Sequence, residues 1–229
     1  MESTTSQRAL AEFVGTFALI FIGAGSIVAT GGENLVAIAI AHGLAIGTMV
    51  SAVGHVSGAH FNPAVTIGAL AAGRISFADA LVYIPTQLVG GIAGALVLRA
   101  AVPRAAFDAV LGGTPALTDV STGQAILIEA VLTFFLVWVV FAVAVDPAGS
   151  FGKIAGLAIG FVITMDIFMG GPFTGAAMNP ARAFGPALVG GTWTDQFVYW
   201  IGPIIGALAA ALAYQHVILR DRGDATPEF

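Results

Sequence analysis

Six long apolar runs follow one another along the chain, separated by shorter polar connections. A helix that crosses the apolar core of a bilayer takes about 20 residues, and the runs have roughly that length. We therefore predict six membrane-spanning helices, at residues 10–29, 35–53, 80–101, 124–145, 154–169 and 197–219. The polar segment from about Pro103 to Thr122 is expected to be a long loop between the third and fourth spans.

Two further apolar stretches, residues 62–72 and 179–189, are too short to cross the bilayer at the helical rise of about 1.5 Å per residue. Each stretch begins with Asn followed by Pro, as Asn62-Pro63 and Asn179-Pro180. Asparagine is a preferred N-cap, and proline is favoured at the first helical position, where its missing N–H costs nothing. We therefore predict two half-helices that enter the membrane and end inside it.

The two halves of the chain resemble each other at a shift of 117 residues. At this shift Glu12 falls on Glu129, Gly58 on Gly175, and Asn62-Pro63-Ala64 on Asn179-Pro180-Ala181. Between these anchors, glycine patterns match at shifts of 113 and 112, which we interpret as differences in loop length. Each half carries three full spans, so the second half must be inverted in the membrane relative to the first. The predicted fold is an all-α membrane protein with six transmembrane helices and two re-entrant half-helices in an inverted repeat.

The half-helices are expected to meet near the middle of the membrane, beside water. Irregular backbone at that depth is tolerated only where it is buried in protein or lines a wet cavity. The side-chain oxygens of Asn62 and Asn179 cap the half-helices, which leaves their amide N–H groups to donate into the cavity. Each helix N-terminus adds about half a positive charge. Such a centre favours water and repels cations. We expect a single channel domain over residues 1–229, with a first repeat at 8–101 and an inverted second repeat at 123–219.

Composition excludes several other classes of protein. Apolar residues make up 58% of the chain and charged residues only 9%, which is typical of a membrane protein. We therefore expect the lipid bilayer to be its partner. The net charge of −5 comes from scattered residues, which argues against nucleic-acid binding. There is no cysteine, and the histidines lack metal-ligand spacing, so we expect no metal and no cofactor. An intramembrane enzyme is disfavoured because the chain has neither GxSxG nor HExxH.

Three segments resemble the aquaporin family, also called major intrinsic proteins: residues 11–17, residues 57–66 and residues 175–182. The resemblance implies a bundle of six tilted helices with one pore per subunit, assembled as a homotetramer. The repeat and the resemblance both indicate that Glu12 and Glu129 brace the re-entrant loops. His60 is expected to fix its loop rather than to contact solute. In this interpretation Pro63, Ala64, Pro180 and Ala181 form the first turns of the half-helices that carry Asn62 and Asn179.

The resemblance also places a selectivity filter at four positions: His42, Ile167, Ala176 and Arg182. Arg182 lies about one helical turn beyond Asn179, and a guanidinium within a membrane is costly enough to indicate a function. This set of four is similar to the tonoplast-type subgroup, whose members pass water together with ammonia, peroxide or other small neutral solutes. The loop before the fourth span has no matching filter histidine, which argues against ammonia. The residues after Arg182 look like the water-channel branch rather than the glycerol branch.

We predict a passive water channel with some permeability to small neutral solutes that excludes protons and ions. A secondary transporter of a small solute is the alternative function, because inverted repeats with broken helices also occur in such transporters. Short, proline-capped breaks favour the channel. Basic residues favour cytoplasmic termini, with Arg8, Arg74, Lys153, Arg220 and Arg222 inside against Arg99 and Arg104 outside. The single lysine and many alanines favour a bacterial cell (inner) membrane, whereas the tonoplast likeness suggests a vacuolar membrane. Asp166 is expected to bond a re-entrant loop or to tune His42.

Overall fold

The computed structural model describes residues 3–149 and 154–220, and all regular elements of these residues are helices. Six segments are long and apolar enough to cross a membrane, which confirms the predicted spans, with several ends shifted by a few residues. Some spans consist of more than one element. The spans are α1 (Thr5–Ala18) with π-helical η1 (Leu19–Ala24) and α2 (Gly25–Thr30); α3 (Leu35–Ser57); α5 (Phe77–Ala101); α7 (Thr122–Val140) with η3 (Phe141–Val145); α8 (Ala155–Thr174); and α10 (Val198–Ala213) with η5 (Tyr214–Ile218).

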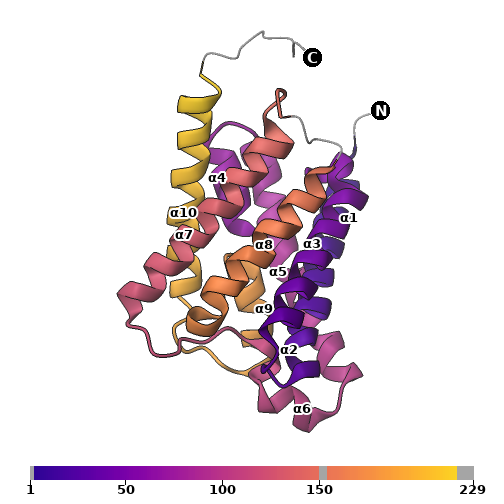
Figure 1. Ribbon diagram of the computed structural model, residues 1–229. Coiled ribbons are helices and arrows are strands. Elements are labelled where there is room, and N and C mark those ends of the chain that lie inside the picture. The colour runs from indigo at the N-terminus through magenta and orange to yellow at the C-terminus, as the bar shows by residue number, and fades with distance from the viewer. Residues whose placement is uncertain (1–2, 150–153, 221–229) are drawn as a thin grey trace.

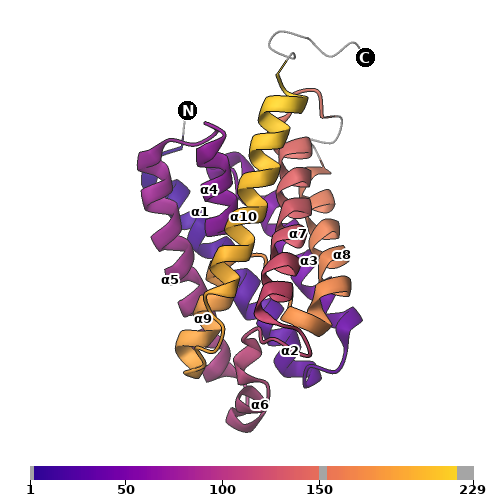
Figure 2. The same cartoon turned by 90° about the vertical axis from the view of Figure 1, so that its left-hand side faces the viewer.

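The two predicted half-helices are present as α4 (Pro63–Ala71) and α9 (Pro180–Gly190). Both have proline in the first turn and an asparagine N-cap, Asn62 and Asn179. The six spans run side by side along the long axis of the molecule (Figure 1). Figure 2 shows α4 at the end of the bundle where α1 begins, and α9 at the opposite end. The half-helices therefore enter from opposite faces, as an inverted repeat requires.

Close packing of α1 on α5 and of α7 on α10 fixes the register between the halves. Gly90 of α5 lies against the backbone carbonyl of Phe13. Gly206 of α10 lies against the carbonyl of Ala130, which is 117 residues after Phe13. Gly206 is therefore the counterpart of Gly90, at a shift of 116 residues. The predicted shift of 112, which pairs Gly90 with Gly202, is wrong by one helical turn.

The same error affects α3 and α8. Ser57 at the end of α3 and Thr174 at the end of α8, 117 residues apart, donate their hydroxyls to Glu12 and Glu129 respectively. Both helices are continuous up to those residues, so Gly43 is the counterpart of Gly160 and the predicted shift of 113 is wrong. Glycines four residues apart give the same pattern when one half is shifted by one helical turn, which explains both errors.

The connection between α5 and α7 is more ordered than the predicted loop. It contains the short helix α6 (Arg104–Ala109) and the 3-10 turn η2 (Leu111–Gly113), both at the end of the molecule away from the start of α1 (Figure 1). Phe107 is buried, and its ring covers Gly112, which leaves no room for a side chain there. This contact holds the turn against α6.

Candidate functional site

The first turns of the half-helices are closed by their asparagine caps. Oδ1 of Asn62 accepts a hydrogen bond of 2.8 Å from the backbone N–H of Ala64. Oδ1 of Asn179 accepts hydrogen bonds of 2.9 Å from Ala181 and 3.3 Å from Arg182. Both caps use the side-chain oxygen, so the amide N–H groups point away from their own helices.

The two half-helices are joined through these amides. Nδ2 of Asn62 donates a 2.8 Å hydrogen bond to the carbonyl of Met178, the residue before Asn179. In return, Nδ2 of Asn179 donates a 2.9 Å bond to the carbonyl of Phe61, the residue before Asn62. A primary amide has two hydrogens, so each asparagine keeps one for the cavity. The prediction of wholly free amides is therefore wrong: half of their donor capacity holds the opposite loop.

Glu12 lies buried behind the first re-entrant loop and accepts four hydrogen bonds. Its Oε1 accepts from the Ser57 hydroxyl at 2.7 Å and from the backbone N–H of His60 at 2.9 Å. Its Oε2 accepts from the N–H of Phe61 at 2.7 Å and from Nε2 of Gln87 at 2.8 Å. The carboxylate thus satisfies buried backbone donors of the loop, as its predicted bracing role requires.

Glu129 has the matching position behind the second loop. Its Oε1 accepts from the Thr174 hydroxyl at 2.7 Å and from the N–H of Ala177 at 2.9 Å, and its Oε2 accepts from the N–H of Met178 at 2.7 Å. Pro203 stands 116 residues after Gln87, and no amide side chain among the described residues completes this second set. The two braces are equivalent in backbone bonding but differ in their side-chain donors.

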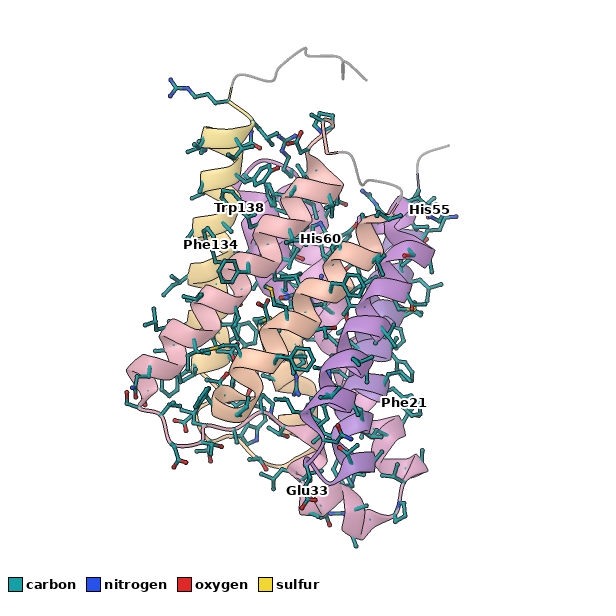
Figure 3. All side chains as sticks on the ribbon, in the orientation of Figure 1. Phe21, Glu33, His55, His60, Phe134 and Trp138 are labelled. Carbon is teal, nitrogen blue, oxygen red and sulfur yellow. The ribbon has the colours of Figure 1, made fainter. Side chains whose placement is uncertain are left out.

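His60 is held inside the first loop. Its ring lies 3.0 Å from the Thr66 hydroxyl through Nδ1 and packs edge-on against Tyr83, with 5.4 Å between ring centroids. Figure 3 shows His60 within the bundle, whereas His55 lies close to the end of the molecule where α1 begins. These contacts support the expectation that His60 fixes its loop.

Both re-entrant loops contain residues with unusual backbone conformations. Ala59 and Phe61 have φ values of 51° and 50°, and their counterparts Ala176 and Met178 have 43° and 52°. Residues other than glycine rarely adopt positive φ, and such positions cluster at functional sites. The same two loop positions thus have positive φ in each half. The backbone N–H groups that bond to Glu12 and Glu129 belong to these residues or to their neighbours.

The four predicted filter residues come together around one cavity. His42, Ile167, Ala176 and Arg182 are each at most 3% exposed, and all four line the cavity that also contacts Asn62 and Asn179. Nδ1 of His42 lies 2.8 Å from the carbonyl of Ile38. A carbonyl only accepts, so Nδ1 carries the proton, and Nε2 remains without a partner in the part of the chain that the structure describes.

Arg182 is fixed from the outer connection. Its Nη1 donates a 2.8 Å hydrogen bond to the carbonyl of Gly113, in the turn η2. Its Nε has no partner among residues 3–149 and 154–220. The guanidinium is thus held at Nη1, and its Nε is a buried donor that no described residue satisfies. Sequence reasoning did not find Gly113, because nothing local marks a carbonyl 69 residues from the arginine.

Three cavities follow one another through the molecule and share lining residues. The central cavity has a volume of about 50 Å³, which holds only a few water molecules. It shares lining residues, among them His60 and Val65, with a wide vestibule of about 780 Å³ at one end. At the other end it shares His42, Ile167 and Arg182 with an outer vestibule of about 310 Å³. The central cavity therefore includes both the asparagines and the filter.

Tyr83 and Tyr199 also support the loops and were not predicted. Their hydroxyls donate to the backbone carbonyls of Ser57 at 2.7 Å and Thr174 at 2.8 Å. The two tyrosines lie 116 residues apart, so the corrected repeat shift is the signal that could have found them.

Asp166 does not have the predicted contact. It is 1% exposed, and its Oδ2 has no hydrogen-bond partner in the described residues. No hydrogen bond joins its carboxyl to a re-entrant loop within that same part of the chain, so this expectation is wrong. Asp166 precedes the filter residue Ile167 but does not itself line the central cavity.

Comparison with known proteins identifies the family. The model of the major intrinsic protein family matches residues 1–214. The chain belongs to this family. Two relatives of this major intrinsic protein are a probable aquaporin TIP3-2 of Arabidopsis thaliana, 46% identical over 92% of the chain and 83% of the relative, and an aquaporin TIP4-4 of Zea mays, 43% identical over 93% and 87%. The predicted likeness to tonoplast-type aquaporins is confirmed by these TIP-type relatives.

A solved structure supports the fold of this major intrinsic protein. The X-ray structure of the aquaglyceroporin from Plasmodium falciparum superposes with a TM-score of 0.84, covering 95% of this chain and 98% of the other. The two sequences are 24% identical, so the likeness establishes the shared fold and nothing about solutes. It confirms the predicted six spans and two half-helices in an inverted repeat. Members of the family are channels rather than enzymes.

Proposed function

We propose that this chain is a passive water channel that also passes small uncharged solutes and excludes protons and other ions. The observation that carries the proposal is the crossed pair of asparagines at the tips of α4 and α9, beside a narrow cavity that shares lining residues with a vestibule at each end. Membership of the major intrinsic protein family and the TIP-type relatives support the same function.

Water would meet donors and a positive potential at the centre. Asn62 and Asn179 each offer one amide hydrogen, and the N-termini of α4 and α9 add about half a positive charge each. A water molecule that accepts from both amides turns its hydrogens away from the centre, and a chain of hydrogen bonds that could conduct protons is interrupted there. Cations are repelled by the same potential.

The filter would act as a second, polar constriction. The imidazole of His42 and the guanidinium of Arg182 supply polar groups to the lining, and Ile167 and Ala176 supply apolar surface. A fixed guanidinium repels cations, and a small alanine leaves space for neutral solutes somewhat larger than water. We propose these four residues as the selectivity filter and the two asparagines as the central constriction.

Stopped-flow light scattering on proteoliposomes tests the channel. We expect rapid osmotic shrinkage with a low activation energy, and no proton current with a pH-sensitive dye. Saturable flux with a strong temperature dependence would instead indicate the secondary transporter, which no finding favours.

The Asn179→Asp variant tests the central barrier. A carboxylate at the N-terminus of α9 offsets the positive potential, so we expect proton or cation leak. The measurement is dye-reported proton entry under an imposed potential, with the native chain as control. Intact proton tightness would contradict the electrostatic explanation.

We further propose a homotetramer with cytoplasmic termini and a single channel domain per chain, built from repeats at 8–101 and 123–219. The tetramer follows from the family resemblance. For orientation, Arg8, Arg74 and Arg220 lie at the ends of spans on the proposed inner side, while Lys153 and Arg222 lie outside the described residues. The low lysine content favours a cell membrane, and the TIP-type relatives favour a vacuolar one; fractionation of the source cells decides between them.

A further inference from the structure

The first span contains a π-helical segment, η1 (Leu19–Ala24), between two α-helical parts. Such segments are rare, frequently lie at functional sites, and rotate the residues that follow relative to an unbroken α-helix. Within it, the carbonyl of Gly23 accepts a 2.6 Å hydrogen bond from the hydroxyl of Ser26, which satisfies a backbone group in the altered turn. The last two residues of η1 are Gly23 and Ala24.

Gly23 provides the space that the ring of His42 occupies. A Cβ atom added at Gly23 would lie 2.6 Å from Cδ2 and 2.7 Å from Nε2 of His42. Real Cβ atoms do not approach other atoms so closely, so any side chain here must displace the imidazole. The opposite edge of the ring is held by the bond between Nδ1 and the carbonyl of Ile38. Displacement must therefore move the Nε2 edge of the ring away from η1.

Ala24 supports the other polar filter residue. The backbone of Gly113, which has a φ of 76°, lies so close to Ala24 that an added Cβ would be 2.8 Å from the Ala24 methyl. The carbonyl of Gly113 receives the 2.8 Å hydrogen bond from Nη1 of Arg182. Ala24 is 1% exposed, so this contact is fully enclosed.

We infer that Gly23 and Ala24 are specificity-determining positioning residues, which together set the separation of His42 and Arg182. One π-helical segment contacts the imidazole directly and the guanidinium through a single backbone carbonyl. Neither residue needs to touch solute. The inference rests on the proposed function, because it assumes that His42 and Arg182 form the filter.

The first experiment uses Gly23→Ala in full-length chain reconstituted into liposomes. The added methyl should push the ring into the narrow cavity and lower water permeability per channel by about threefold or more. In a His42→Ala background the same change should have no further effect, because the ring is gone. Gly25→Ala is the matched control in the same span, since its methyl meets only the flexible end of Leu98, at 3.4 Å.

The second experiment uses Ala24→Gly, which introduces no clash and so remains informative where Gly23→Ala does not accumulate. Removing the methyl loosens Gly113 and releases Arg182, so glycerol uptake relative to water should rise by about threefold. In an Arg182→Val background, Ala24→Gly should leave this ratio unchanged.

Background dependence separates positioning from general packing. Equal fold-changes with and without His42 or Arg182, or an unchanged glycerol-to-water ratio in both variants, would overturn the inference. Absence of water flux through the native chain would contradict the proposed function itself. Native water flux together with background-independent effects would contradict only the positioning role.

Discussion

At the scale of single residues, two carboxylates maintain an unfavourable backbone. Each re-entrant loop has two non-glycine residues at positive φ, and such positions cost about 1–3 kcal/mol each. Glu12 and Glu129 each accept two backbone N–H bonds from these loops, and hydrogen bonds to a charged group contribute about 1.5–3 kcal/mol each. The two terms are of similar size, so the bonds are needed to offset the strain.

Replacing Glu129 by Gln should release the second loop. The amide keeps one acceptor oxygen, and its NH₂ group faces a backbone donor, which costs about 1–3 kcal/mol. We expect a lower midpoint of thermal unfolding in detergent and loss of most water permeability. Glu33→Gln, at an exposed glutamate between the first two spans, is the control and should change neither quantity. A Glu129→Gln protein as stable and permeable as the native one would contradict the bracing role.

Replacing Asp166 should have the opposite effect on stability from replacing Glu129. A buried carboxyl oxygen without a partner costs about 1–3 kcal/mol compared with an apolar group. Asp166→Leu is therefore expected to raise the free energy of unfolding by about that amount, measured by denaturation in mixed micelles, with water permeability unchanged. A less stable variant would reveal a contact made by the carboxyl in the membrane.

At the scale of elements, the half-helices depend on close backbone contacts. Gly185 of α9 lies directly against the backbone of Gly91 in α5. At its counterpart, Gly68 of α4, an added Cβ would lie 3.0 Å from the carbonyl oxygen of Ala207 in α10. Neither backbone can give way as a side chain could. The half-helices can therefore pack this closely on the spans because glycine has no side chain at these contacts.

A methyl group at Gly185 should separate α9 from α5. We expect Gly185→Ala to lower thermal stability and water flux, because a backbone contact has to open. Gly123→Ala is the matched control: no described residue lies within 4 Å of its added Cβ, and alanine favours the helix by about 0.5–1 kcal/mol. Gly123→Ala should therefore be neutral or stabilising. Equal losses in both variants would show that glycine loss alone, rather than this contact, is responsible.

Elements differ in how far they could be predicted from the sequence. The half-helices were predicted within about a residue, because Asn-Pro is a local signal for a helix start. The glycine register was predicted one turn out, since a four-residue spacing is self-similar and only contacts such as Gly206 on Ala130 distinguish the alternatives. The turn η2 and the carbonyl of Gly113 depend on long-range packing on Phe107 and Ala24, which leaves no local pattern.

At the scale of the whole molecule, the route through the chain runs between the two halves. Each half supplies one asparagine and one brace, but the filter is unequal: Arg182 has Val65 as its counterpart, 117 residues earlier. The inverted repeat therefore gives a symmetric centre and an asymmetric passage. The filter with Arg182 and the smaller vestibule lie on one side of the asparagines, and the wide vestibule lies on the other.

Single introduced cysteines can test the orientation, because the native chain has none to interfere. Glu33→Cys, in the connection after α2, should react with a membrane-impermeant maleimide added to intact cells. Arg74→Cys, between α4 and α5, should react only after the membrane is opened. The reverse labelling pattern would place the termini outside.

The purified protein should also have a mass of four times 23.1 kDa by light scattering corrected for detergent.

The crossed bonds at the tips of α4 and α9 give biosynthesis a fixed order. When the first repeat emerges from the ribosome, the amide of Asn62 has no carbonyl to bind, since Met178 lies 116 residues further along the chain. The hydrogen bonds that join the two half-helices consequently form late in assembly, only after most of the chain has been inserted. A polypeptide that stalls before Met178 can hold its early spans in lipid but cannot close the junction through which water would flow.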